Sequence, residues 1–269
     1  MKTNASIVTY RTDSDELRKC LRSLSASGDI ATVYIVDNSS SAATEAVAAE
    51  FEGVEYIPHP NTGYGDAHNV ALRKSLDAGA DFHLVINSDV YFGGDVLPRC
   101  LGYMAEHQEC VQLIPHTVFP DGRRQYVCHP LPTPFDMLMR GFLPKSWFRG
   151  RRRRYDLADF ALDRPLDVPY HHGCFMLLRC SALRECGLFD PRYFMYPEDI
   201  DLTRRMHRHG ETVYFPGATI VHAHRAESKK SWRMRKVHII NMLRYFRKWG
   251  FFIDAERRRE NRRLYESMR

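Results

Sequence analysis

The sequence lacks the features that mark several large classes of protein. No hydrophobic run approaches the ~18 apolar residues that a membrane-spanning helix requires. The first residues contain no apolar stretch that ends in small residues, so we expect no signal peptide. None of the seven cysteines belongs to a CxxC pair, which argues against a zinc ribbon and against a disulfide scaffold. Because there is no internal repeat either, we expect a reduced globular protein of the cytoplasm.

The composition is ordinary, but the charge is unevenly distributed. Of the 269 residues, 44% are hydrophobic and 27% are charged, and this length allows one large domain or two small ones. The net charge of +6 is concentrated near the end, where residues 225–269 include 15 basic and 5 acidic side chains. A second basic run covers 149–154. These segments indicate an anionic partner, either nucleic acid or a membrane surface.

Strand and helix patterns alternate through the N-terminal part of the chain. Apolar strands are predicted at 5–10, 31–36, 54–57, 82–87 and 111–114, and amphipathic helices at 13–25, 44–51 and 64–78. This alternation is typical of an α/β fold in which helices flank a mostly parallel sheet. In such sheets ligands bind at the carboxyl ends of the strands. The polar residues that follow each strand are therefore the first candidates for a site.

The regular alternation ends near residue 115. Residues 115–170 are rich in proline and include the 149–154 arginine run, so an irregular insertion is predicted there. Strands are predicted again at 174–178, 212–215 and 219–222, with helices at 199–208 and 231–248. We therefore predict one domain over 1–225 and a basic amphipathic helical extension over 226–269.

A glycine-containing motif lies between the third strand and the following helix. It reads Asn61-Thr-Gly-Tyr-Gly-Asp-Ala-His-Asn69 and places two glycines at a junction whose backbone N–H groups suit phosphate. It lacks the third glycine of a dinucleotide fingerprint and the GK[ST] of a Walker loop. Taken alone, such a motif is more often an ordinary turn and helix cap.

Carboxylates follow two predicted strands. Asp89 closes Asn87-Ser-Asp89 and could bind a divalent cation that carries a diphosphate, although an Asx turn would also explain it. In Tyr196-Pro-Glu-Asp-Ile-Asp-Leu202, one carboxylate could be a general base that its neighbours orient. The competing interpretation is that acidic residues at a helix start favour the helix dipole.

His222 and His224 follow the last predicted strand. Alternate residues of a strand point to opposite faces, so both histidines cannot easily bind one metal ion. One of them could join Asp89, although a lone histidine at a strand end is more often a hydrogen-bonded structural residue.

In their order and spacing, these motifs resemble family 2 glycosyltransferases of the GT-A type. The resemblance covers residues 5–225 and includes Val-Thr-Tyr in the first strand, Val-Asp-Asn in the second and Gly-Cys-Phe at 173–175. The stretches 187–201 and 244–254 are similar to bacterial rhamnosyltransferases that build O-antigen and related surface polysaccharides. The resemblance implies a Rossmann-like GT-A fold.

The resemblance also implies a role for each matching residue. The nucleotide would be held by Thr9, Tyr10 and Asp37, and the rest of the donor pocket would be lined by Asn61, Gly63, Asn69 and Asn87. Asp89 would bind Mg²⁺ or Mn²⁺ on the donor diphosphate, with His222 beside it in preference to His224. Asp199 would be the catalytic base with Glu198 as its neighbour, and Gly173 and Cys174 would border the acceptor.

The function that this resemblance implies is inverting, metal-dependent transfer of L-rhamnose from dTDP-L-rhamnose to a glycan or polyprenyl-diphosphate-linked acceptor. The family often has Asp-x-Asp where this chain has Asn87-Ser-Asp89, which lowers the charge available for the metal. Three alternatives stay open: a UDP-hexose donor, a catalytically silent nucleotide-sugar or glycan-binding module of the same fold, and a nucleic-acid-binding protein. No recognised nucleic-acid-binding motif accompanies the basic runs.

The predicted C-terminal helix carries an apolar stripe at helical spacing. Its core is Val237, Ile240, Leu243 and Phe246, with basic residues on both sides and five arginines between 257 and 263. The stripe could pack against the catalytic body. Alternatively, it could lie in the headgroup region of an anionic membrane, which would place the protein at the inner face of the membrane.

Overall fold

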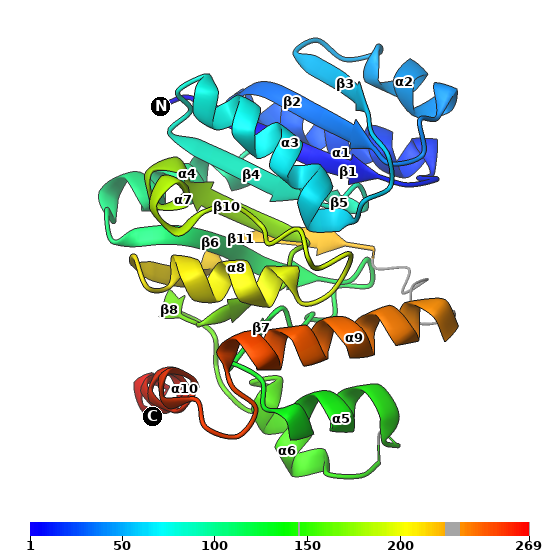
Figure 1. Ribbon diagram of the computed structural model, residues 1–269. Coiled ribbons are helices and arrows are strands. Elements are labelled where there is room, and N and C mark those ends of the chain that lie inside the picture. The colour runs from blue at the N-terminus through cyan, green and yellow to red at the C-terminus, as the bar shows by residue number, and fades with distance from the viewer. Residues whose placement is uncertain (145, 224–231, 269) are drawn as a thin grey trace.

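The computed structural model describes residues 1–144, 146–223 and 232–268 (Figure 1). His224, the alternative metal-side histidine, lies outside the described residues. Helices cover both faces of a central sheet, and the C-terminal helices α9 and α10 lie beside α5 and α6 at one end of the molecule. Within the described ranges, no helix combines the length and the apolar character that crossing a bilayer demands.

The sheet is mixed, with the strand order β3-β2-β1-β4-β10-β6-β11-β5. Strands β3, β2, β1 and β4 run parallel, β10 is antiparallel between β4 and β6, and β11 is parallel to β6. The strands are β1 (Thr3–Thr9), β2 (Ile30–Asp37), β3 (Val54–Pro58), β4 (Phe82–Ile86), β5 (Val90–Tyr91), β6 (Cys110–Val118), β10 (Phe175–Arg179) and β11 (Glu211–His222). The predicted α/β sheet is thereby confirmed.

The alternation of side chains along the central strands explains the two helical layers. In β10, Phe175 and Leu177 pack in one apolar cluster with α1 (Ser14–Ser27) and α4 (Val96–Glu106). Met176 and Leu178 pack in another cluster, with α3 (Tyr64–Asp77), α7 (Cys180–Cys186) and α8 (Glu198–Met206). Successive residues of a strand point to opposite faces, so strands buried on both sides appear as continuous apolar runs. The short helix α2 (Ala42–Ala48) packs beside α1 and β3.

Several parts of the structure differ from the sequence-based expectation, which includes neither α4 nor β5. Residues 115–170 were expected to be irregular, but they contain α5 (Pro134–Phe142), α6 (Arg149–Tyr155) and three short strands, β7 (Cys128–His129), β8 (Leu166–Asp167) and β9 (Tyr170–His171). Residues 211–222 form one strand instead of two. The predicted break is a register shift between Phe215 and Thr219, which surrounds Pro216 and Gly217. Proline cannot donate to the ladder, so pairing is interrupted while the strand continues.

The C-terminal helices pack on the body through only part of the predicted stripe. In α9 (Trp232–Trp249), Met242, Tyr245 and Phe246 are buried in a cluster with Tyr193 and Ile200. Ile239, Ile240 and Leu243 of the same helix are exposed. The stripe therefore has one face against the body and one face toward solvent. The following helix, α10 (Ala255–Ser267), lies within the helical extension predicted over 226–269. Its own bounds are not predicted, because its apolar pattern is reduced to Leu264 among charged residues.

Candidate active site

The predicted nucleotide-binding residues lie at the carboxyl ends of β1 and β2. The Thr9 hydroxyl donates to Asp37 Oδ1 at 3.0 Å, and Tyr10 is exposed next to it. The Asp37 carboxylate is buried and accepts further hydrogen bonds from Ser39, Ser41 and Tyr56. Burial acts to raise the pKa of Asp37, but these donors outweigh it and lower the pKa. Asp37 is thus a charged residue that organises the loop after β2.

The glycine motif holds the loop that leads to the carboxylate pair. Gly63 has φ = +120°, and a Cβ atom there would lie 2.3 Å from the Phe194 carbonyl oxygen. The next residue, Tyr64, donates its N–H to the same carbonyl at 2.9 Å. Asn69 is buried, and its amide bonds both the N–H and the carbonyl of Phe189. Asn61 is exposed at the start of the motif. Gly63 and Asn69 therefore fix the 189–194 segment against α3.

At the centre of the site, side chains from four segments meet. The Tyr64 hydroxyl lies 2.9 Å from Asn87 Oδ1 and 2.7 Å from the Gly173 carbonyl oxygen. The Gly173 N–H donates to Asp199 Oδ2 at 3.2 Å. A Cβ on Gly173 would be 3.4 Å from Asp199 Cβ and 3.5 Å from the Tyr64 ring, so only a glycine leaves this space open. Asn87 is joined to Cys174 through its backbone N–H at 3.0 Å.

The carboxylates Glu198 and Asp199 are neighbours at the start of α8, where Glu198 is buried and Asp199 is half-buried. Burial raises the pKa of Asp199 to about 6, against the opposing hydrogen bonds from the N–H groups of Ile200 and Gly173. Burial and the charge of Asp199 raise the pKa of Glu198 well above its usual range. Glu198 Oε2 is buried and finds no hydrogen-bond partner among the described residues. Both pKa values are raised, so each carboxyl group holds its proton to a higher pH than an exposed carboxyl group would.

The third carboxylate of the motif, Asp201, has a different role. It is buried and faces the C-terminal helix, where it pairs with Lys248 at 2.6 Å and accepts from Trp249 Nε1 at 2.8 Å. Arg205 lies 2.9 Å away on the other side. Asp201 thus ties α8 to α9.

Helix α9 also holds the loop before the carboxylate pair. The buried Asn241 amide donates to the Met195 carbonyl at 2.9 Å, and Arg244 donates to the Arg192 carbonyl at 2.7 Å. The rings of Tyr196 and His238 meet edge to face with centroids 4.9 Å apart. The segment that leads into Glu198 is therefore held from the sheet side by α3 and from the outer side by α9.

The predicted metal-side residues are neighbours in space. His222 Nε2 lies 3.4 Å from Asp89 Oδ1, at the junction between β11 and β5. Gln125 fixes the imidazole, since its Oε1 lies 2.9 Å from His222 Nδ1 and its Nε2 donates to the His222 carbonyl at 2.5 Å. The amide oxygen can only accept, so Nδ1 carries a proton and Nε2 faces Asp89. Despite burial, the pKa of His222 is raised to about 10 by the neighbouring Cys174 and Asp89.

This pair of side chains fits a divalent cation that is shared with a ligand. Asp89 supplies a hard oxygen, and Gln125 orients the imidazole of His222 as outer-shell groups orient metal-ligating histidines. No group of three or more acidic, histidine or cysteine ligands occurs within residues 1–144, 146–223 and 232–268. Mg²⁺ and similar ions are commonly bound by one or two protein ligands together with substrate phosphates. The geometry therefore fits a cation that the protein holds jointly with a diphosphate.

Several residues of the site are absent from the sequence-based prediction. Tyr64 and Gln125 each form a hydrogen bond with a predicted residue, and Asn241 holds the Met195 carbonyl in the loop before Glu198. Tyr64 lies inside the predicted glycine motif, so its place at the helix start was a usable signal. Gln125 and Asn241 lie far along the chain from their partners, and no local pattern marks them.

Comparison with known proteins places this geometry in a family. A model of the family described as Glycosyl transferase family 2 matches residues 5–187. The chain is 31% identical to the N-acetylglucosaminyl-diphospho-decaprenol L-rhamnosyltransferase of Mycobacterium tuberculosis (strain H37Rv) over 239 residues, 82% of this chain and 75% of that protein. It is 24% identical to the rhamnosyltransferase WbbL of Escherichia coli (strain K12) over 248 residues, 89% of this chain and 90% of that one.

The fold is also that of solved glycosyltransferases. A crystal structure of GalNAc-T7 with UDP, GalNAc and Mn²⁺ superposes with a TM-score of 0.60 at 13% identity, covering 82% of this chain and 44% of that one. This likeness shows a GT-A fold, and the chain spans less than half the length of that protein. Since the family model and the mycobacterial relative both match most of the chain, this protein is a glycosyltransferase that belongs to glycosyl transferase family 2.

Proposed function

We propose that this glycosyltransferase transfers L-rhamnose from dTDP-L-rhamnose, with inversion, to a glycan or polyprenyl-diphosphate-linked acceptor in bacterial surface polysaccharide synthesis. Two relatives are named rhamnosyltransferases, and one of them carries N-acetylglucosaminyl-diphospho-decaprenol in its name. The observation that carries the reaction type is the half-buried Asp199 carboxylate, which lies beside Glu198 and accepts a hydrogen bond from the Gly173 N–H.

Asp199 accepts the proton of the acceptor hydroxyl. As this oxygen bonds to the anomeric carbon, the bond from that carbon to the diphosphate breaks and the nucleoside diphosphate leaves. A single base on the side opposite the leaving group gives inversion of configuration. Gly173 and Cys174 border the acceptor, and the absent Cβ of Gly173 leaves room beside Asp199. Glu198 stays protonated and so preserves a single negative charge in the pair.

Asp89 and His222 hold Mg²⁺ or Mn²⁺ together with the donor diphosphate. When bound, such a cation neutralises the charge that develops on the leaving diphosphate. Asn87 adds no charge and instead accepts a hydrogen bond from Tyr64, which connects the metal side to Gly173. In this motif Asp89 is therefore the one charged metal ligand, whereas an Asp-x-Asp motif would supply two.

The donor nucleotide lies over the ends of β1 and β2, next to Thr9, Tyr10 and the Asn61 side of the glycine motif. The exposed Tyr10 ring is available for stacking on the base. Asp37, Gly63 and Asn69 act through the loops that they fix, because their polar or close contacts are made within the protein.

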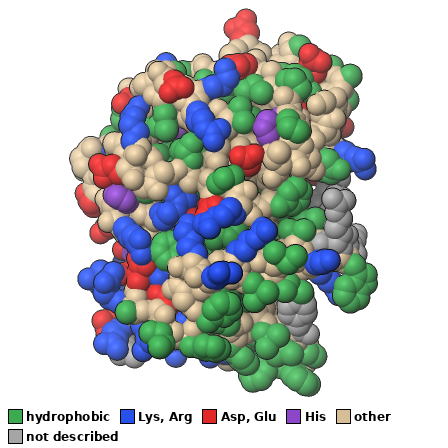
Figure 2. Space-filling model, viewed as in Figure 1, with side chains coloured by type: hydrophobic (Ala, Val, Ile, Leu, Met, Phe, Trp, Pro, Cys, Tyr) green, Lys and Arg blue, Asp and Glu red, His purple; other side chains and the backbone are tan. Residues whose placement is uncertain are grey.

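We further propose that residues 1–225 are the catalytic domain and 226–269 a basic extension that associates with an anionic membrane at its cytoplasmic face. The support is the exposed side of α9, where Ile239, Ile240 and Leu243 lie between basic residues. Figure 2 shows hydrophobic side chains gathered over α5 and along α9, with Lys and Arg close by. Such a surface suits the interfacial region of a bilayer and places the enzyme beside a lipid-linked acceptor.

A donor screen tests this proposal. Purified protein is incubated with dTDP-L-rhamnose, UDP-glucose, UDP-galactose and GDP-mannose, with and without Mn²⁺, and the released nucleoside diphosphate is measured. We expect metal-dependent release from dTDP-L-rhamnose. Turnover with a UDP-hexose and with no other donor would show that dTDP-L-rhamnose is the wrong donor, and it would leave the family assignment unchanged. Binding of a donor without any release, in the presence of acceptor and metal, would favour a silent binding module.

A further inference from the structure

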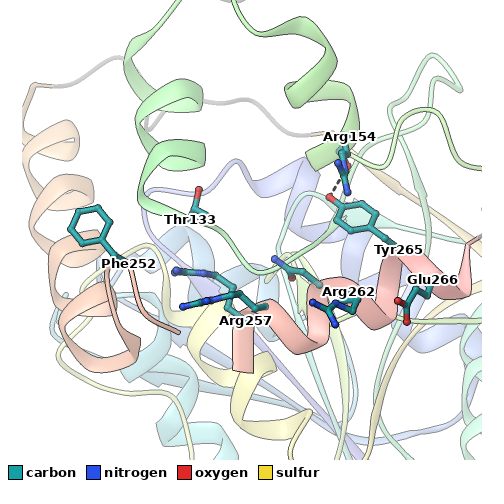
Figure 3. Close-up of a pocket in the computed structure, with 9 residues that line it drawn as sticks. Thr133, Arg154, Phe252, Arg257, Arg262, Tyr265 and Glu266 are labelled. Atoms are coloured by element: carbon teal, nitrogen blue, oxygen red, sulfur yellow. Dashed lines mark hydrogen bonds between the residues drawn. The ribbon is translucent and has the colours of Figure 1, made fainter. Parts of the chain in front are cut away.

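A strongly basic pocket lies apart from the carboxylate pair, between α10 and the α5–α6 segment (Figure 3). It has a volume of about 540 Å³, and four of its nine lining residues are arginines, namely Arg154, Arg257, Arg258 and Arg262. Glu266 is the single acidic residue in the lining. The Thr133 and Tyr265 hydroxyl-bearing side chains also line it. The pocket therefore offers several cationic donors to one ligand.

Most of this positive charge is not neutralised within the protein. The side chains of Arg258 and Arg262 are exposed, and among the described residues neither guanidinium makes an ion pair or a hydrogen bond. Arg257 is 5% exposed and donates to the carbonyls of Pro132, Gly250 and Phe251. Its nearest carboxylate, Asp254 at 3.8 Å, is already bonded to both terminal nitrogens of Arg204. The floor of the pocket is therefore a buried cation with weak local compensation.

A second pocket of similar size provides the contrast. It has a volume of about 560 Å³ and also contains arginines, but these are paired. Arg204 binds Asp254 and Glu256, Arg208 binds Glu256, and Arg205 binds Asp201. Arg204 and Arg208 join α8 to Glu256 of α10, and Arg205 pairs within α8. In the first pocket, Arg257 donates to backbone carbonyls and Arg154 lies over the Tyr265 ring, whereas the guanidinium groups of Arg258 and Arg262 have no carboxylate partner among the described residues.

The basic pocket has exposed apolar neighbours. Phe252 lines it and is 85% exposed, and Ile253 beside it is 82% exposed. A soluble anion gains nothing from such neighbours. A phospholipid, in contrast, presents a phosphate next to acyl chains, so both features of the surface are used together.

We propose that this pocket binds the phosphate of an anionic phospholipid headgroup while Phe252 and Ile253 insert beside it. Arg154, Arg258 and Arg262 contact the phosphate from α6 and α10, and Thr133 and Tyr265 complete the rim. The inference rests on the proposed membrane association. It goes further by assigning the association to one headgroup site, where the proposed function requires only a basic surface.

The test is sedimentation of the full chain with vesicles of phosphatidylcholine alone or with phosphatidylglycerol. Arg258→Gln/Arg262→Gln removes two pocket charges. The matched control, Arg259→Gln/Arg263→Gln, removes two charges from the same helix outside the pocket, where both arginines pair with Glu260. We expect phosphatidylglycerol-dependent binding that weakens roughly 10- to 30-fold in the pocket variant, the loss typical of two basic groups at an anionic surface. The control should change several-fold less. Phe252→Ser/Ile253→Ser should also weaken binding.

Four outcomes would overturn the proposal. Equal losses in the pocket and control variants would indicate diffuse surface charge. Full vesicle binding by Phe252→Ser/Ile253→Ser would show that these two side chains do not insert into the membrane. Displacement from vesicles by inorganic phosphate at low millimolar concentration would assign the pocket to a soluble anion. Tight binding of an oligonucleotide that depends on Arg258 and Arg262, without vesicle binding, would assign it to nucleic acid. Donor hydrolysis is measured in parallel, so loss of the headgroup site is distinguished from failure of the glycosyltransferase assignment.

Discussion

The buried Asn241 amide of α9 donates to the Met195 carbonyl at 2.9 Å, and this bond connects the C-terminal helix to the loop that delivers the carboxylate pair. Three residues further on, Glu198 begins α8, and Asp199 faces Gly173. The family model ends at residue 187, so α9 lies beyond the matched segment. The position of Asp199 therefore depends on a helix that is remote in sequence.

Asn241→Ala should reduce both stability and turnover. The change leaves the Met195 carbonyl without its donor, which costs about 1–3 kcal/mol for a buried group. Because the loop then holds Asp199 less firmly, kcat should fall roughly tenfold while donor affinity stays close to that of the wild type. Leu243→Ala, on the exposed side of the same helix, is the control and should change neither. A normal kcat in Asn241→Ala would show that the contact from α9 is not needed to position Asp199.

The raised pKa of Asp199 predicts opposite pH dependences of activity and stability. The rate, kcat/KM, should rise with pH through about 6, as Asp199 loses its proton. The folded state binds this proton more tightly than the unfolded state does, so its stabilising effect is complete at low pH and is lost as pH rises through about 6. Asp199→Asn should therefore unfold like the wild type near pH 4 and be more stable by roughly 1–3 kcal/mol at pH 8. Denaturant titrations at both pH values check this, and equal stabilities at pH 8 would contradict it.

Gln125 should control metal affinity although it is not a ligand. Gln125→Leu removes the acceptor for His222 Nδ1 and frees the imidazole to turn. Losing an outer-shell partner of this kind typically weakens metal binding 10- to 100-fold. Calorimetric titration of Mn²⁺ in the presence of dTDP measures the effect. Gln108→Leu is an exposed control with the same change in side chain, and Asp89→Ala should abolish the metal-dependent part of binding altogether. Unchanged affinity in both Gln125→Leu and Asp89→Ala would refute the metal site.

Gly63→Ala should be among the most damaging small substitutions. The added Cβ would lie 2.3 Å from the Phe194 carbonyl oxygen, and the backbone has φ = +120°. We expect a loss of roughly 2–4 kcal/mol in the free energy of unfolding. Gly79→Ala separates the effect of the steric clash from that of the positive φ. Gly79 also has a positive φ, of +68°, but no atom lies within 4 Å of its Cβ position. It should cost only ~1 kcal/mol.

The sequence predicts this fold well where local periodicity and burial agree. The strands at 82–87 and 174–178 are mostly apolar, and both are central strands buried on two faces. The bounds of helix α10 escape prediction because its contacts are made mainly by charged residues, such as Arg257, which donates to backbone carbonyls, and Glu260, which pairs with Arg259. A hydrophobic pattern cannot reveal a helix of this kind.

The site is predictable at the level of motifs but not of individual roles. Asp199 and Asp201 are two residues apart in one acidic motif, yet one faces Gly173 and the other binds Lys248 and Trp249. Which carboxylate points where depends on α9, and that contact is invisible to local sequence. Likewise, the pairing of Asp89 with His222 follows from the antiparallel contact of β5 with β11, whose strands are distant in the chain.

The measurement that tests the central claim most directly is transfer from dTDP-L-rhamnose by Asp199→Asn, compared with Glu198→Gln and the wild type, with donor affinity measured in parallel. Asparagine keeps the shape of aspartate and cannot accept the proton, so kcat should fall by ~10²–10⁴-fold with little change in donor affinity. Glu198→Gln mimics the protonated glutamate and should keep much of the activity. A nearly normal rate in Asp199→Asn together with an inactive Glu198→Gln would show that the wrong carboxylate has been assigned as the base.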